Sequence, residues 1–314
     1  SNKVKIEHYF CFPLWTKKMD ERFKRNMSWN KQISMRIMRR YVALWIFIIA
    51  SIANAWAQYD IQVELRGLSC DENLILAYRT GEKQYVQDSS ICKNGIFHFA
   101  GNNNLPTGNY VVILPDQRFF DIIVSENEDQ TKYVFRTDTN LYADDIQVEG
   151  SMENKVFLGL RAFSALQNAA KDYLVSGMSA DTDEVKKQEV KKKIEVLANN
   201  IGQERDRLIA QYPELFVSKL LKASVEVTIP DAPEGMEREE ARKYKYDWIR
   251  KHYFDNIDLT EKGLIRTEEY EMAIKRYFDK YAPRDVDTAI AMVDAFLEKV
   301  KTEGSIEQYR FSTH

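Results

Sequence analysis

The chain has 314 residues, of which 44% are hydrophobic and 30% are charged, and its formal net charge is −3. The charge is unevenly distributed, because residues 1–57 contain 11 Lys and Arg but only 3 Asp and Glu. Residues 58–314 therefore contain 34 basic and 45 acidic residues and have a net charge of −11. Proteins that bind nucleic acids or anionic membrane surfaces carry a basic surface patch. Because residues 58–314 are acidic overall, neither is expected as the main partner. An acidic balance also favours solubility.

Residues 35–57 have the three parts of a secretory signal peptide, namely a basic start, an apolar run and the small-x-small cleavage site Ala55-Trp56-Ala57. Cleavage there leaves Gln58 as the first mature residue and predicts an exported protein, in the periplasm or at the cell envelope. The apolar run to Ala57 has 17 residues, the short end of what spans a bilayer, so an uncleaved membrane anchor is the alternative. Residues 1–34 precede this signal and are interpreted as an upstream leader outside the mature protein.

Residues 58–150 are predicted to form an antiparallel β-sandwich or barrel-like domain. Polarity alternates from Tyr59 to Leu65, and this period of two turns one face of a strand inward. Turn residues such as Lys93-Asn94-Gly95 separate about eight short strands with no helix between them, which is typical of such folds. The further strands are expected at 73–79, 83–91, 95–101, 109–115, 119–125, 132–138 and 146–150.

Residues 151–314 are predicted to form an all-α domain that is truncated at its C-terminus. A capping box of Asp181 and Glu184 is expected to start one long helix that runs past Leu208. Its charged segment EVKKQEVKKK is interpreted as a solvated helix face. The other helices are expected at 154–175, 213–224, 236–253, 264–281 and 285–302. The fold class is therefore α+β multidomain, with a β domain followed by a helical domain.

The segment QDSSICKNGIFHFAG (87–101) concentrates the most reactive side chains. Cysteine catalysis requires a low-pKa thiolate, often in CxxC, or a thiol beside a base, and no CxxC occurs in the sequence. Strand alternation places His98 on the face opposite Phe97 and Phe99, so we interpret it as a surface histidine and not as the base for Cys92. No Gly-x-Ser-x-Gly elbow and no close His or Cys pairs of a zinc site occur either. The sequence predicts no enzyme activity, catalytic residue, cofactor or metal.

Two further features are candidate binding sites. The acidic stretch DNIDLTEKG (255–263) lacks the calcium-loop pattern, because Ile257 and Leu259 occupy ligand positions. It is interpreted as a helix-connecting loop capped by Asp258 or Thr260. Strand tyrosines could offer platforms for a sugar, although such tyrosines more often pack in a core. They are Tyr78, Tyr85, Tyr110 and Tyr133.

Cys70 and Cys92 are the cysteines of the predicted mature chain, and in an oxidising compartment an even pair is a disulfide candidate. If strands 73–79 and 83–91 form a hairpin with Arg79 opposite Lys83, the same register brings Cys70 opposite Cys92. The Cα separation of such a pair approaches the ~4.4–6.8 Å that a disulfide requires. The sequence therefore predicts a Cys70–Cys92 bond.

Several segments carry a resemblance to a known family. LILAYRTGEKQYVQDSSICKNGIFHFAG, LPTGNYVVIL, FFDIIVSE and VEGSMENKVF resemble the N-terminal β-domain, of uncharacterised function, in exported thioredoxin-like thiol-disulfide interchange proteins (TlpA/ResA-like) of some Gram-negative bacteria. FVSKLLKA, HYFDNIDL and GLIRTEEYEMAIKRYFDKY are similar to the second uncharacterised domain that follows in these proteins. Together they cover about residues 59–310. A thioredoxin-like domain with CxxC usually comes next in that family, and this sequence ends before one.

Two functions follow as expectations. The resemblance implies a non-catalytic exported accessory region that acts in docking, dimerisation or substrate presentation, with a thioredoxin-like domain or protein, or a second copy, as its partner. The alternative is an independent periplasmic protein that binds a glycan or a peptide through the sheet face and its tyrosines. A membrane is expected as a partner only if the signal segment stays uncleaved.

Overall fold

The computed structural model describes residues 58–314 except 82, 141–144, 180–182, 284 and 314. The predicted leader (1–34) and signal segment (35–57) lie outside the described residues. The chain from Ala57 to His314 forms one compact unit. In the described part of the chain, no helix is both long enough and apolar enough to cross a membrane.

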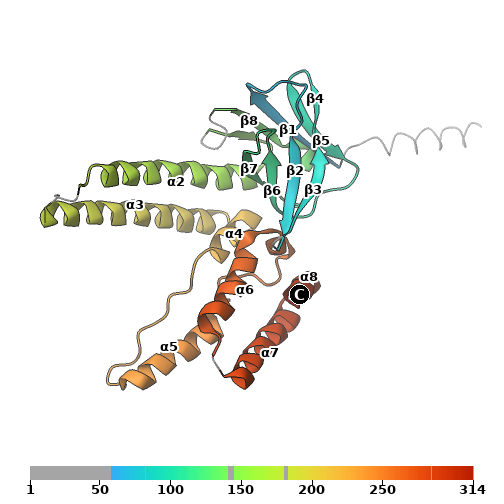
Figure 1. Cartoon of the computed structure of the whole chain (residues 1–314). Helices are drawn as coiled ribbons and strands as arrows, with labels where there is room; N and C mark the ends of the chain where they lie inside the picture. Colours follow the sequence, from blue (N-terminus) through green and yellow to red (C-terminus); the bar gives the residue numbers. More distant parts are fainter. Residues whose placement is uncertain (1–57, 82, 141–144, 180–182, 284, 314) are drawn as a thin grey trace, which may run out of the picture. The chain divides into compact units, whose positions relative to one another are not determined.

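Residues 58–150, called the β region below, form two packed sheets (Figure 1). Sheet A has the strand order β4-β5-β1-β8-β9, and sheet B has the order β3-β2-β6-β7. Among the described strands, neighbours are antiparallel except β1 and β8, which are parallel. The strands are β1 (Tyr59–Arg66), β2 (Ile75–Thr80), β3 (Lys83–Ser89), β4 (Ile91–Lys93), β5 (Ile96–Gly101), β6 (Gly108–Ile113), β7 (Phe119–Val124), β8 (Val134–Asp138) and β9 (Gln147–Glu149).

The predicted alternation of β1 is confirmed. Its inward residues from Tyr59 to Leu65 are buried, whereas the polar residues between them are partly exposed. Alternate residues of both sheets, such as Phe97, Phe120 and Phe135, complete one core between the layers. Burial of these apolar side chains is the main favourable term that holds the two sheets together. Of the predicted alternatives, an antiparallel sandwich or a barrel-like domain, the structure has two packed sheets, with the parallel pair of β1 and β8 as an exception.

The predicted strand 83–91 is wrong in one respect, because the chain changes sheet at Ser90. β3 ends at Ser89 in sheet B and β4 begins at Ile91 in sheet A. Ser90 is buried, its N–H donates to the Leu74 carbonyl oxygen (2.9 Å), and its Oγ accepts from the Leu74 N–H (2.8 Å). These two bonds hold the chain where it crosses between the layers.

Replacing Ser90 with alanine is expected to lower the free energy of unfolding by about 1 kcal/mol, because the buried Leu74 N–H would lose its acceptor. Urea denaturation followed by circular dichroism measures this change. Ser89→Ala, at the exposed neighbouring position, is the matched control. Equal stability of the two variants would contradict this role of the Ser90 hydroxyl.

The Cys70–Cys92 disulfide is present, with a Cα separation of 5.3 Å, but the register from which it was predicted is wrong. Lys83 pairs with Thr80 and not with Arg79, and a bulge follows between Leu76 and Ala77. The turn has two residues rather than three, as tight hairpins prefer. Cys70 lies in the loop that leaves sheet A, and Cys92 lies in β4 of the same sheet. The disulfide therefore links the loop by which the chain leaves sheet A to the strand β4 by which it returns to that sheet.

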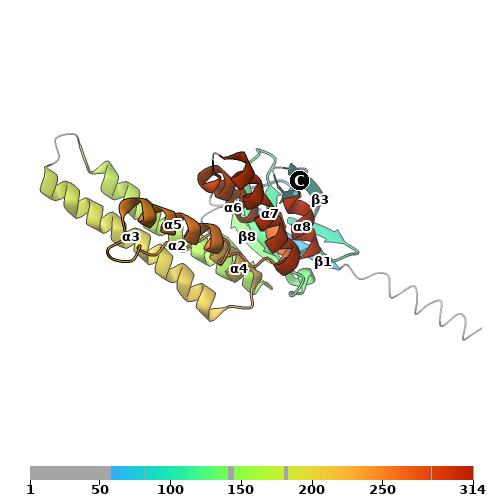
Figure 2. The same ribbon diagram turned by 90° about the horizontal axis from the view of Figure 1, so that it is seen from below.

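Residues 151–314, the helical region, contain α-helices and one short 3₁₀-helix, as the sequence predicts. The helices α2 and α3 run side by side as a long hairpin (Figures 1 and 2). The elements are α2 (Met152–Ser176), α3 (Glu184–Gln211), α4 (Phe216–Ala223), α5 (Arg238–His252), the 3₁₀-helix η2 (Lys262–Arg266), α6 (Glu268–Tyr281), α7 (Val286–Glu303) and α8 (Ile306–Ser312). A second 3₁₀-helix, η1 (Gln130–Lys132), lies in the β region.

The helical region differs from the predictions in a helix cap, an interruption and one additional helix. Asp183, whose side chain accepts from the Lys186 N–H (2.8 Å), caps α3, and the expected cap Asp181 lies outside the described residues. The single helix predicted at 264–281 is interrupted at Thr267, whose backbone is extended and whose hydroxyl donates to the Leu264 carbonyl oxygen (2.7 Å). The helix α8 was not predicted. The 3₁₀-helix η2, which precedes Thr267, contacts β2 and β6 of sheet B.

A second core joins the two regions. Residues of α4, η2, α6 and α7, among them Phe216, Leu264 and Phe296, pack around Ile123 of β7. Ile123 belongs to the face of sheet B that points away from the core between the sheets, since its neighbours Ile122 and Val124 belong to that other core. The helical region therefore packs directly on the outer face of sheet B.

Candidate functional site

Cys92 and His98 lie on opposite faces of sheet A. Cys92 pairs with Phe97 across β4 and β5 and packs against the core. His98 lies on the outer face, as predicted, and its Nδ1 is 3.0 Å from Oδ1 of Asp60. Asp60 as a partner was not expected from the sequence. No serine, threonine or cysteine of the described chain bonds to either side chain, so the pair has no nucleophile beside it.

The tyrosines weighed as sugar platforms mostly pack inside the protein. Tyr110 and Tyr133 are buried in the core of the β region. Tyr78 packs partly against that core and stacks on Tyr85, with ring centroids 5.5 Å apart. Tyr85 alone among these four is exposed. These residues therefore do not form the row of aromatic platforms on which the glycan hypothesis depends.

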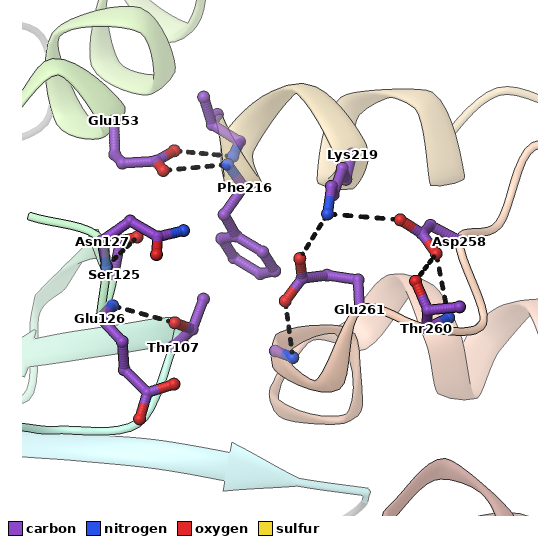
Figure 3. A network of polar contacts seen from close by, with 12 residues as sticks. Thr107, Ser125, Glu126, Asn127, Glu153, Phe216, Lys219, Asp258, Thr260 and Glu261 are labelled. Atoms are coloured by element: carbon purple, nitrogen blue, oxygen red, sulfur yellow. Dashed lines mark hydrogen bonds and ion pairs between the residues drawn. The ribbon is translucent and has the colours of Figure 1, made fainter. Parts of the chain in front are cut away.

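The acidic stretch 255–263 connects α5 to η2, and a lysine forms ion pairs with two of its acidic side chains (Figure 3). Asp258 accepts from the Thr260 N–H (2.9 Å) and closes the turn, whereas Glu261 caps η2 by accepting from the Gly263 N–H. The Lys219 Nζ of α4 is 3.3 Å from Asp258 Oδ2 and 2.7 Å from Glu261 Oε2. Within the described ranges, no three His, Cys, Asp or Glu side chains are grouped as a metal site.

The segment GSMEN (150–154) forms the polar junction between the two regions. Ser151 caps α2 by accepting from the Asn154 N–H (3.1 Å), and its hydroxyl donates to Oε2 of Glu128 (2.7 Å). Glu128 Oε1 accepts the N–H groups of Met152 (2.6 Å) and Glu153 (3.1 Å). The Glu128 carboxylate therefore satisfies the donors at the start of α2, where a negative charge is favourable.

Glu153 holds the start of α4 (Figure 3). The residue is only 1% exposed. One carboxylate oxygen accepts a hydrogen bond from the Phe216 N–H (2.9 Å), and the other accepts one from the Val217 N–H (2.8 Å). Burial raises the pKa of Glu153, against the lowering effect of these two hydrogen bonds, and the charge of Glu128 raises it further. A carboxyl of α2 thus supplies the cap that α4 lacks in its own sequence.

Asn154 binds the edge strand of sheet B. Its residue is fully buried, its Nδ2 donates to the Ile123 carbonyl oxygen (2.6 Å), and its Oδ1 accepts the Ile123 N–H (2.7 Å). The amide therefore pairs with β7 as a further strand would, and it covers an edge that would otherwise expose unpaired backbone groups. The segment GSMEN is distinctive because three of its side chains join α2, α4 and β7.

A cleft of about 520 Å³ lies between the outer face of sheet B and the start of α6. We call it the junction cleft. Its polar lining includes Arg79, Asn109, Asp121, Arg266, Glu268 and Glu269. Its apolar lining includes Val111, Ile113, Phe119, Phe157 and Leu220. A concave space of this size with mixed lining is typical of ligand-binding sites.

The charges of the junction cleft are only partly paired. Arg79 forms an ion pair with Glu268, and Asp121 forms one with Arg161 of α2 (2.8 Å). The guanidinium of Arg266, a half-buried residue, has neither a hydrogen bond nor an ion pair with any described residue. Burial raises the pKa of Glu269, and the charge of Asp121 adds to this effect. Arg266 is therefore a partly desolvated cation without a counterion.

Two glycines allow η2 to approach sheet B closely enough to form this cleft. A Cβ at Gly108, the first residue of β6, would lie 2.6 Å from the Cβ of Arg266. A Cβ at Gly263 would lie 2.8 Å from Cγ2 of Thr107 and 2.7 Å from the Phe216 ring. Both contacts are too close for another residue type. The stem of Arg266 thus lies directly on the start of β6.

Two family models match the chain, each described as a domain of unknown function. Residues 59–157 match DUF4369, and residues 178–314 match DUF5106. The chain therefore contains two domains of unknown function. Neither the curated proteins nor the solved structures gave a significant match.

The DUF4369 match extends through GSMEN to Phe157 in α2. The junction cleft is lined from both matches, by strand residues and Phe157 of DUF4369 and by Leu220 and residues 266–269 of DUF5106. The sequence does not predict any of the four cleft residues Arg79, Asn109, Asp121 and Arg266 as a site residue. The segment GLIRTEEY, which contains Arg266, was noted only for its resemblance.

Proposed function

We propose that this chain is a non-catalytic binding module of an exported thiol-disulfide system and that the junction cleft engages its partner or substrate. The observation that carries the proposal is the cleft itself, with its unpaired, half-buried Arg266. A charge removed from water costs free energy unless a counterion or hydrogen bonds compensate it. A bound ligand that supplies the counterion would remove that cost, which is why we assign the cleft to binding.

Two other features support an exported protein that works with a thioredoxin-like partner. The Cys70–Cys92 bond fits an oxidising compartment, where structural disulfides persist. The link to a thioredoxin-like partner is supported by the resemblance of the two regions, in the same order, to the domains that precede the thioredoxin-like domain in exported thiol-disulfide proteins. No catalytic role is assigned to Cys92 or His98, which lie on opposite faces of sheet A.

An independent periplasmic ligand-binding protein is the second candidate, and the junction cleft also favours it. Of its two ligand classes, a peptide suits the cleft better than a glycan does. The lining combines charged side chains with aliphatic ones, whereas Tyr110 and Tyr133, which were weighed as sugar platforms, are buried in the core. Glycan binding more often depends on exposed aromatic rings.

In vivo photocrosslinking separates the two candidates. The full chain is expressed in its native host with p-benzoylphenylalanine in place of Gln84 or Gln117, exposed residues that line the cleft, and crosslinked proteins are identified by mass spectrometry. Crosslinks to a thioredoxin-fold protein with a CxxC motif are expected. Lys93, exposed on sheet A, is the control position. If the cleft positions capture no CxxC protein beyond the control, the thiol-disulfide proposal fails.

A further inference from the structure

We infer that the junction cleft binds the C-terminus of an extended peptide, with the terminal carboxylate on Arg266 and an apolar last side chain against the aliphatic lining. The inference rests on the proposed binding function and specifies its ligand. Of the two arginines that line the cleft, Arg79 is paired with Glu268, whereas Arg266 has no hydrogen bond or ion pair with a described residue. A guanidinium binds a carboxylate through two parallel N–H···O bonds, which makes a carboxylate the best matched anion.

The charges around Arg266 favour a ligand with a single negative charge. Arg79 and Arg161 are already paired with Glu268 and Asp121, so neither is available to a second anionic group. Glu269 also lines the cleft without an ion pair in the described chain. A phosphate or a dicarboxylate would face these acidic side chains with an additional charge. A peptide C-terminus carries one carboxylate and therefore meets less of that repulsion.

The remaining lining favours an apolar side chain next to the carboxylate. Val111 and Ile113 of β6 alternate on the outer face of sheet B, and Phe119, which is 52% exposed, pairs with Ile113 across β6 and β7. Phe157 and Leu220 contribute from the helical side. Val111 and Leu220 are already buried, so a Leu, Ile or Phe side chain placed there would cover mainly Phe119 and the partly exposed Ile113 and Phe157.

The length of the cleft favours a peptide over a small carboxylic acid. The stem of Arg266 lies on Gly108, the first residue of β6. The cleft lining follows the same strand from Asn109 to Ile113, and four residue steps of an extended strand span about 14 Å. A peptide of about five residues can therefore follow β6 from Arg266 to Phe119, which pairs with Ile113.

Fluorescence anisotropy with the full chain tests the ligand class. The probes are fluorescein-labelled hexapeptide mixtures with a fixed C-terminal Leu, prepared as the free acid and as the amide. We expect the free acid to bind about tenfold more tightly than the amide, since the amide removes one charge-assisted interaction. Arg266→Gln should abolish that difference, and Arg266→Lys should restore part of it. A fixed C-terminal Asp should bind more weakly than Leu.

Arg242→Gln, which changes an arginine with a 77% exposed side chain on α5, is the matched control and should bind as the wild type does. Unfolding midpoints show whether Arg266→Gln remains folded. Equal binding of acid and amide, or an unchanged preference in Arg266→Gln, would overturn the carboxylate assignment. Competition by N-acetyl-leucine as strong as by the peptides would overturn the peptide assignment in favour of a small acid.

Absence of binding by every probe would overturn the ligand class. Crosslinking at Gln84 and Gln117 still tests the proposed function in that case, because it does not depend on the chemistry of the probe. The two failures are therefore distinguishable.

Discussion

Replacing Glu153 with alanine is expected to lower the free energy of unfolding by about 3 kcal/mol. The carboxylate accepts two backbone N–H groups, those of Phe216 and Val217, at a position that is only 1% exposed. Each buried donor left without an acceptor costs roughly 1–3 kcal/mol, offset in part by removing a buried charge. The start of α4 would also separate from α2, so that the junction between the two regions weakens.

Urea denaturation followed by circular dichroism measures this loss. Glu195→Ala, at an exposed position on α3, is the matched control and is expected to change stability by less than about 0.5 kcal/mol. Glu153→Gln retains one acceptor oxygen and should fall between the two. A loss below about 1 kcal/mol in Glu153→Ala would show that the two N–H groups do not depend on this side chain.

The same carboxyl predicts a pH dependence of stability. Burial raises the pKa of Glu153 in the folded protein above its ordinary value of 4.5, so the folded state binds a proton more tightly than the unfolded chain does. Its contribution to stability is therefore greatest below pH 4.5 and declines as the pH rises through the folded-state pKa. Urea unfolding between pH 4.5 and 7 should show a steeper decline in the wild type than in Glu153→Gln. Parallel pH profiles would contradict this assignment.

Removing the disulfide is expected to lower the free energy of unfolding by about as much as Glu153→Ala does. The bond joins residues 22 positions apart, and closing a loop of this size constrains the unfolded chain by about 3 kcal/mol. The double variant Cys70→Ser/Cys92→Ser should therefore unfold at a lower urea concentration than the wild type. Dithiothreitol should destabilise the wild type by the same amount and leave the double variant unchanged. An effect of the reductant on both proteins would mean that it acts elsewhere.

The parts of the fold that depend on local patterns were predictable. The alternating polarity of β1 and the helical spacing of apolar residues in α2 can be read from residues that are close together in the sequence. The helix α8 could also have been found, because Ser305 and Gln308 form a capping box that the structure contains. The change of sheet at Ser90 could not, since the segment from Lys83 to Ile91 has the composition of one strand and only the pairing of its two halves with different sheets divides it.

The candidate site was less accessible to sequence reasoning, because its contacts join distant positions. Glu153 bonds to residues 63 and 64 positions away, and Arg266 lies on Gly108. Nothing local distinguishes Arg266 from an exposed helix arginine. Its importance depends on the interruption of the predicted helix at Thr267, which required the tertiary structure. The cysteine pair was predictable from compartment and number, although its inferred register was wrong.

The disulfide also determines what a protease can release. The hairpin of β2 and β3 lies wholly between Cys70 and Cys92, and it contributes Arg79 and Gln84 to the junction cleft. A single cut in the turn at Gly81 would thus yield two polypeptides that migrate together until a thiol separates them. One wall of the cleft would remain covalently attached to the rest of the protein after such a nick.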